Sequence, residues 1–186
     1  MNLPNFLTLL RVILIPVLVL AWFLPSQYAG EISALIFVMA AFTDWLDGWL
    51  ARRWKQESAF GAFLDPVADK LMVAAALVLL VDAFDSALVT LSAIVIIGRE
   101  IVVSALREWM SEIGQRAHVA VSWLGKVKTA TQMLAITVCL ALPVKETLLH
   151  PGLWILVIAA LLTLWSMGTY LRAAWPHLSP STSDDD

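Results

Sequence analysis

Residues 32–47 of this chain read Ile-Ser-Ala-Leu-Ile-Phe-Val-Met-Ala-Ala-Phe-Thr-Asp-Trp-Leu-Asp, an apolar run that ends in two aspartates. A second apolar run, Leu71 to Val81, follows closely after Asp65 and Asp69. A carboxylate near a bilayer centre raises the free energy of insertion by roughly 2.5–3.5 kcal/mol, so four unpaired ones approach about 10 kcal/mol. Carboxylates at the ends of two such runs therefore indicate membrane helices that surround a charged site.

The composition is that of a membrane protein. Of 186 residues, 60% are hydrophobic and only 15% are charged, and the mean hydropathy is +0.82. These values exclude a soluble domain, and the length suits about five to seven spans of about 20 residues each. The sequence predicts an all-α, integral membrane bundle of six transmembrane helices over residues 1–178, followed by a disordered polar tail at 179–186. The spans are expected near residues 7–24, 32–51, 66–81, 87–109, 120–142 and 153–172.

The basic residues predict the orientation of the bundle. All twelve Lys and Arg residues except Lys145 fall on one side of the predicted spans. Because cytoplasmic loops carry an excess of Lys and Arg, we expect both termini and the aspartate segment to face the cytoplasm. The three histidines, at positions 118, 150 and 177, fall in or beside predicted loops, and we expect them at the surface.

The four aspartates are spaced to share helix faces. Asp44 and Asp47 are three residues apart, and Asp65 and Asp69 are four apart, so each pair lies on one side of its helix. Two adjacent antiparallel helices could present all four carboxylates toward one another. Oxygen ligands without a nearby Cys or His favour Mg²⁺ or Mn²⁺ over zinc. The pattern therefore indicates a divalent metal site.

The residues around the aspartates fit a phosphate ligand. A metal pair beside a basic residue such as Arg52 would clamp a diphosphate, and Gly48 and Gly61 allow a ligand or a neighbouring helix to approach closely. Of the basic residues, we expect only Arg52 and Lys70 close to the carboxylates.

Two other interpretations compete with a metal site. The aspartates could stabilise helix packing, or they could mark the ion pathway of a cation-coupled transporter. Transporters scatter such residues over internal repeats, whereas these four lie within one short segment and no repeat is evident. The metal site is the favoured interpretation.

The chain resembles the CDP-alcohol phosphatidyltransferase family. It matches every fixed position of the family signature, in Asp44-Trp-Leu-Asp47-Gly48-Trp-Leu-Ala51-Arg52 and in Gly61-Ala-Phe-Leu-Asp65-Pro-Val-Ala-Asp69. Three further stretches, at 2–11, 99–109 and 125–129, look like those of a bacterial branch whose acceptor is sn-glycerol 3-phosphate.

The resemblance implies a homodimeric six-helix enzyme of the bacterial inner (cytoplasmic) membrane, with its active site open to the cytoplasm. The implied reaction transfers the phosphatidyl group from CDP-diacylglycerol to sn-glycerol 3-phosphate, giving phosphatidylglycerophosphate and CMP in anionic phospholipid biosynthesis. Other than its substrates and membrane lipids, the expected partner is a second copy, and no nucleic acid is expected.

The resemblance also implies roles for individual residues. Two Mg²⁺ or Mn²⁺ ions would be bound by Asp44, Asp47, Asp65 and Asp69. Asp69 would also act as the general base. The CDP-diacylglycerol contacts would come from Asn5, Thr8, Gly48, Arg52, Ser58 and Gly61.

The acceptor's dianionic phosphate requires a basic pocket beside the metals. The candidates, at the cytoplasmic ends of the fourth and fifth spans, are Arg99, Arg107, Lys126 and Lys128, with Glu100 orienting one of them. Alternatively, these cations contact anionic lipid headgroups. The cluster favours a phosphorylated acceptor over serine or choline and leaves inositol phosphate open.

Overall fold

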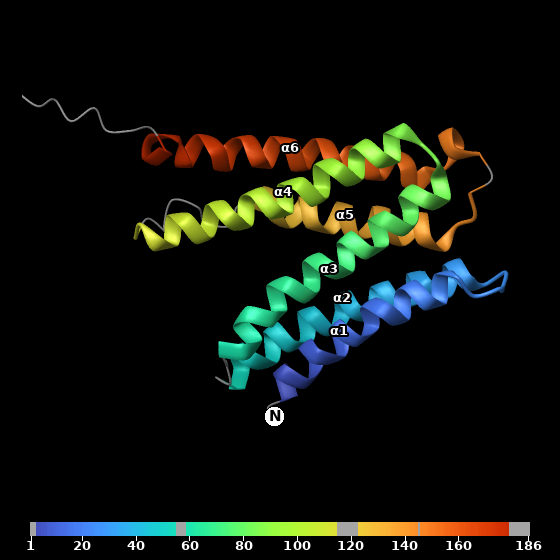
Figure 1. The fold of residues 1–186 in the computed structure, drawn as a ribbon, viewed down its shortest axis with the longest axis horizontal. Coiled ribbons are helices and arrows are strands. Elements are labelled where there is room, and N and C mark those ends of the chain that lie inside the picture. The colour runs from blue at the N-terminus through green and yellow to red at the C-terminus, as the bar shows by residue number, and fades with distance from the viewer. Residues whose placement is uncertain (1–2, 55–58, 115–122, 145, 179–186) are drawn as a thin grey trace, which may run out of the picture.

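The computed structural model describes residues 3–54, 59–114, 123–144 and 146–178, and this part of the chain is helical throughout, apart from its short connections (Figure 1). One α-helix corresponds to each expected span, so the prediction of six helices is confirmed. They are α1 (Leu3–Trp22), α2 (Ala29–Trp54), α3 (Ala59–Phe84), α4 (Ala87–Glu112), α5 (Trp123–Ala141) and α6 (Pro151–Leu178), with a short 3₁₀ helix, η2 (Thr147–Leu149), before α6.

Not every helix is, by its length and hydropathy alone, a candidate membrane span. Three stretches are long and apolar enough to cross a bilayer, namely Ala29–Leu50 of α2, Ala87–Glu112 of α4 and Pro151–Arg172 of α6. Shorter apolar segments cover Phe6–Trp22 and Val127–Ala141. Many large apolar side chains also point outward along these helices, as lipid contact requires. The fold is therefore an all-α membrane bundle.

The helices that carry the signature extend beyond their apolar runs. The third span was expected at 66–81, but α3 runs from Ala59 to Phe84, and α2 continues to Trp54. All four aspartates consequently lie inside helices, where their three- and four-residue spacings place each pair on one face. Residues 55–58, which include Ser58, and the predicted tail at 179–186 lie outside the described residues.

The bundle consists of two groups of three helices (Figure 1). α1 packs against α2 and α3, while α6 packs against α4 and α5, and the pairs α2–α5 and α3–α4 join the groups. Figure 1 shows the groups diverging toward the end where α1 begins and α6 ends. The signature aspartates of α2 and α3, and the basic residues of α4 and α5, belong to this divergent end.

The opposite end of the bundle is closed by tight packing. A side-chain cluster drawn from every helix forms the core, with Leu18, Phe37, Leu77, Ile96, Ile136 and Leu156 among its buried members. Gly30 of α2 lies so near α5 that a Cβ would come within 2.6 Å of the Leu140 carbonyl oxygen. Only glycine permits this approach. The helices are thus held together at one end and separate at the other.

His150 corrects an expectation from the sequence. It was expected at the surface, but it is buried in the connection before α6. Its Nδ1 accepts a hydrogen bond from the Gly152 amide at 3.1 Å, and its ring packs edge-on against Phe84. The buried imidazole thereby satisfies one of the first-turn amides of α6, which have no partner within the helix. The side chains of the other two histidines lie outside the described part of the chain.

Candidate active site

The first aspartate pair is neutralised by an arginine from α1. The guanidinium of Arg11 is buried, and its Nη1 lies 2.7 Å from Oδ1 of Asp44. Its Nη2 donates a hydrogen bond to Oδ2 of Asp47, which is also buried. One guanidinium therefore joins both carboxylates of α2, which is the forked geometry that arginine favours.

The same face of α1 reaches the second aspartate pair. Thr8 precedes Arg11 by three residues, so both side chains lie on one side of α1. The Thr8 hydroxyl donates a hydrogen bond to Oδ1 of Asp65 on α3. α1 thus contacts both signature helices. Thr8, which the family resemblance assigns to the CDP-diacylglycerol site, directly contacts the carboxylate of Asp65.

The cation beside the carboxylates of α2 was not expected from the sequence. Arg52 and Lys70 are the cations expected close to the aspartates, and Lys70 does line the cavity together with Asp69. The cation paired with Asp44 and Asp47, however, is Arg11. From the sequence, Arg11 is one of the basic residues of the cytoplasmic side and the last residue of the stretch 2–11 that resembles the family. An arginine within an apolar span is itself a sign of a functional partner, and that signal could have identified it. The Arg52 side chain lies outside the described residues.

The aspartates match a divalent cation in chemistry. Asp65 repels both Asp44 and Asp47 electrostatically, and Asp44 repels Asp69. These hard oxygen donors carry more negative charge than Arg11 offsets, which is the situation that a divalent ion relieves. Among the described residues, however, no three Asp, Glu, His or Cys side chains converge closely enough to enclose an ion. A bound cation would compete with Arg11 for the same two carboxylates.

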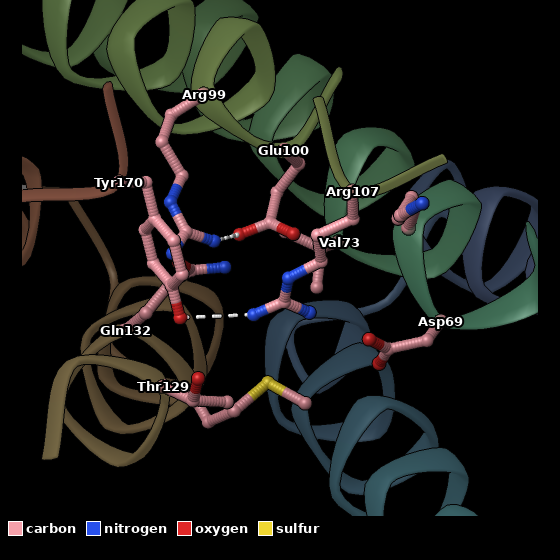
Figure 2. A pocket seen from close by; sticks show the side chains of 10 residues that line it. Asp69, Val73, Arg99, Glu100, Arg107, Thr129, Gln132 and Tyr170 are labelled. Carbon is pink, nitrogen blue, oxygen red and sulfur yellow. Dashed lines mark hydrogen bonds and ion pairs between the residues drawn. The ribbon is translucent and has the colours of Figure 1, made fainter. Parts of the chain in front are cut away.

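A cavity of about 180 Å³ lies beside the aspartates, between the two helix groups (Figure 2). Its lining comes from α3 (Asp69, Lys70 and Val73), α4 (Arg99, Glu100 and Arg107), α5 (Thr129, Gln132 and Met133) and α6 (Tyr170). Figure 2 shows Asp69 on one side of the cavity and Tyr170 on the other, with Arg107 between them in this view. The cavity therefore combines a signature carboxylate with two arginines.

Glu100 holds two of the predicted basic residues. Its Oε1 lies 2.8 Å from Nη1 of Arg99 and 2.6 Å from Nζ of Lys128. The expectation that Glu100 orients a cation of this cluster is confirmed. Lys128 does not itself line the cavity, but it is paired with Glu100, which does. Because both cations are almost completely buried, the shared carboxylate is what offsets their desolvation.

Tyr170 of α6 is a site residue that the sequence analysis missed. Its ring lies beneath both arginines, 5.5 Å from the Arg99 guanidinium carbon and 5.2 Å from that of Arg107. Its hydroxyl accepts a hydrogen bond from Nη2 of Arg107 at 2.9 Å (Figure 2). Ser166, one turn earlier, accepts a 3.3 Å bond from Arg99. Polar residues at four-residue spacing within the last apolar span were the available signal.

The structure brings most of the predicted site residues to one end of the bundle. Arg11 and Thr8 of α1 contact Asp44, Asp47 and Asp65, while Arg99 and Arg107 share the cavity with Asp69. Gly48 and Gly61 lie in α2 and α3 within the signature. The side chains of Asn5, Ser58 and Lys126 lie outside the described residues, so their predicted roles stay predictions.

Comparison with known proteins gives one family. The family model described as CDP-alcohol phosphatidyltransferase matches residues 1–172. A protein from Sodalis glossinidius (strain morsitans) is 58% identical over 174 residues, which cover 94% of this chain and 95% of the relative. A protein from Yersinia pestis (strain Pestoides F) is 56% identical over 178 residues, which cover 96% of this chain and 97% of the relative. Both relatives are named CDP-diacylglycerol–glycerol-3-phosphate 3-phosphatidyltransferase.

Proposed function

Because this chain belongs to the CDP-alcohol phosphatidyltransferase family, we propose that it transfers the phosphatidyl group of CDP-diacylglycerol to sn-glycerol 3-phosphate. The products are phosphatidylglycerophosphate and CMP. The names of the relatives supply this donor and this acceptor. The observation that carries the proposal is that Asp69 of the signature lines the same cavity as Arg99 and Arg107.

The two arginines suit the phosphate of the acceptor. Guanidinium groups bind phosphate oxygens bidentately, and a dianion is held best where several fixed cations converge. Arg99 is positioned by Glu100, Ser166 and the Tyr170 ring, so little side-chain freedom remains to be lost on binding. Arg107 is more exposed and hydrogen-bonded to Tyr170, which places it to meet an incoming phosphate. The acceptor therefore enters with its phosphate toward α4 and α6.

We assign to Asp69 the activation of the hydroxyl at the other end of the acceptor. It lines the cavity from α3, opposite Tyr170 in Figure 2. A base within hydrogen-bond reach of the hydroxyl accepts its proton as the oxygen attacks phosphorus. The oxygen forms a new bond to the lipid-side phosphorus, and the bond from that phosphorus to the CMP oxygen breaks. The proton passes to the Asp69 carboxylate, which releases it to water before the next turnover.

The donor diphosphate is assigned to the aspartates beyond the cavity. Members of this family are generally dependent on a divalent metal. We assign two Mg²⁺ or Mn²⁺ ions to Asp44, Asp47, Asp65 and Asp69, where they would offset the diphosphate charge and the charge on departing CMP. Thr8 and Arg11 fix the carboxylates from α1. Asn5, Gly48, Arg52, Ser58 and Gly61 complete the proposed donor site.

The proposal also covers the cellular location and the oligomeric state of the protein. Several helices have the length and apolarity of membrane spans. We assign the protein to the bacterial inner membrane, as a homodimer, with the divergent end of the bundle facing the cytoplasm. The concentration of basic residues at that end supports this orientation. A soluble acceptor and a lipid donor would then meet at the membrane surface.

The test is a transfer assay with the purified full-length protein in lipid–detergent micelles. CDP-diacylglycerol is supplied with sn-glycerol 3-phosphate, inositol phosphate, serine or choline, and CMP release is followed with and without a chelator. We expect the greatest turnover with glycerol 3-phosphate, its loss on chelation, and its recovery with Mg²⁺ or Mn²⁺. Faster transfer to another acceptor would overturn the acceptor assignment. Full activity in excess chelator would overturn the metal site.

A further inference from the structure

Gln132 of α5 is a buried side chain in the cavity that the proposed reaction does not yet use. It is 4% exposed, and its Oε1 has no hydrogen-bond partner among the described residues. A buried acceptor without a partner destabilises a protein, so native structures seldom retain one without a reason. The residue lines the cavity together with Asp69 and Arg99 (Figure 2).

Arg99, another residue of the cavity lining, has an unpaired buried donor. Nε of Arg99 is buried and has no hydrogen-bond partner in the described part of the chain, although the terminal nitrogens of the same guanidinium bind Glu100 and Ser166. A ligand that satisfies both groups must carry an acceptor for Nε of Arg99 and a donor for Oε1 of Gln132, and a phosphate oxygen and a hydroxyl group are such a pair. A phosphorylated alcohol with more than one hydroxyl has both.

The position of Gln132 separates it from the cations. It follows Lys128 by four residues, so the two side chains lie on one face of α5, with Gln132 one turn farther from the divergent end of the bundle. Lys128 is already paired with Glu100. With the phosphate held by the arginines and the reacting hydroxyl at Asp69, the remaining polar group of a glycerol phosphate is its second hydroxyl. Gln132 lines the cavity and has an acceptor left for it.

We propose that Oε1 of Gln132 accepts a hydrogen bond from the non-reacting hydroxyl of the acceptor and thereby selects a polyol phosphate over a simple alkanol phosphate. This inference rests on the proposed transferase function and deepens it. A site built to bind a hydroxyl discriminates strongly against the analogue that lacks it, because the analogue leaves the buried acceptor unpaired.

The test compares two acceptors that differ by that one hydroxyl, sn-glycerol 3-phosphate and propane-1,3-diol monophosphate. Steady-state CMP release is measured with each for the full-length wild type, Gln132→Met and Gln132→Glu. Methionine has a similar length and no strong acceptor, whereas glutamate keeps a carboxyl oxygen in place of the amide oxygen. Thr137→Val is the matched control on α5, because the Thr137 hydroxyl donates to the Met133 carbonyl of its own helix and does not line the cavity.

The wild type and Thr137→Val should favour glycerol phosphate by about tenfold in kcat/KM, which corresponds to one hydrogen bond. In Gln132→Met this ratio should fall close to one, with the apparent KM for CDP-diacylglycerol unchanged. Gln132→Glu should keep a preference for glycerol phosphate, even if both acceptors react more slowly.

Two results would overturn the inference while leaving the transferase function intact. These are equal use of both acceptors by the wild type, and an unchanged ratio in Gln132→Met, whether or not both acceptors react more slowly. Absence of transfer from CDP-diacylglycerol to glycerol phosphate by the wild type would instead refute the proposed function itself.

Discussion

The guanidinium of Arg11 lies 2.7 Å from the carboxylate of Asp44, and the same buried group binds Asp47. The pair joins α1 to α2 across a separation of 33 residues, where the apolar sequence would otherwise enclose two carboxylates. Arg11 therefore has two effects on the site. It stabilises the aspartates within the bundle, and it occupies lone pairs that a divalent ion would also use.

Replacement of Arg11 should make the fold depend on metal. In Arg11→Met, Asp44 and Asp47 lose their partner, and the loss should be about 3 kcal/mol or less because Asp44 remains 44% exposed. Added Mn²⁺ should then raise the melting temperature more in this variant than in the wild type, since the ion no longer competes with a guanidinium for the two carboxylates. Arg53→Met is the control, because Arg53 is exposed and stacks on Trp49. Equal metal-induced shifts in both proteins would refute the competition.

Asp69→Asn should separate proton transfer from donor binding. Asparagine keeps the shape and one carbonyl oxygen but cannot accept the hydroxyl proton, so kcat should fall by roughly 10²–10⁴-fold. Binding of CDP-diacylglycerol, measured by calorimetry with Mg²⁺ present, should change little. Turnover near the wild-type rate would remove Asp69 from the role of base.

Arg99→Ala should act on the acceptor and leave the donor unaffected. A charge-assisted hydrogen bond contributes about 1.5–3 kcal/mol, so kcat/KM for glycerol 3-phosphate should fall by roughly ten- to a hundredfold. The apparent KM for CDP-diacylglycerol should stay the same when each substrate is varied in turn. Arg172→Ala is the matched control, since Arg172 is exposed and does not line the cavity. An equal effect on both substrates would mean that Arg99 supports the whole site.

Tyr170→Phe should show whether the hydroxyl positions Arg107. The variant keeps the ring beneath both arginines and removes the acceptor at 2.9 Å. The loss of one hydrogen bond, about 0.5–1.5 kcal/mol, should raise the KM for glycerol 3-phosphate by up to roughly tenfold with little change in kcat. Tyr170→Leu also removes the cation–π contacts and should have a larger effect. If both variants behave as wild type, Tyr170 serves only the α4–α6 packing.

Glu100 and Lys128 should be coupled in stability. Glu100→Gln leaves Lys128 buried and uncompensated and should lower the melting temperature in detergent. The double variant Glu100→Gln with Lys128→Met should recover part of that loss, because the unpaired charge is gone. Additive effects of the two substitutions would show that the ion pair contributes nothing measurable.

The sequence by itself determined the helices and the identity of the chemical groups. Apolar run lengths set six helices, and the three- and four-residue spacings of Asp44, Asp47, Asp65 and Asp69 set which side chains share a face, because both are local properties of an α-helix. The signature indicated the family, and the basic residues of the fourth and fifth spans predicted a phosphate site. The expected helix ends were less accurate, since α2 and α3 continue past their apolar runs.

Only the tertiary structure decided which helix faces meet. Arg11 with Asp47, Thr8 with Asp65, and Arg107 with Tyr170 lie 36, 57 and 63 residues apart in the chain. No local spacing relates such residues. Their contact depends on how each helix is rotated and tilted against its neighbours, and the packing of side chains along the whole bundle sets that. The unpaired acceptor of Gln132 is likewise a property of the packed cavity, because a polar atom lacks a partner only once every neighbouring helix is in place.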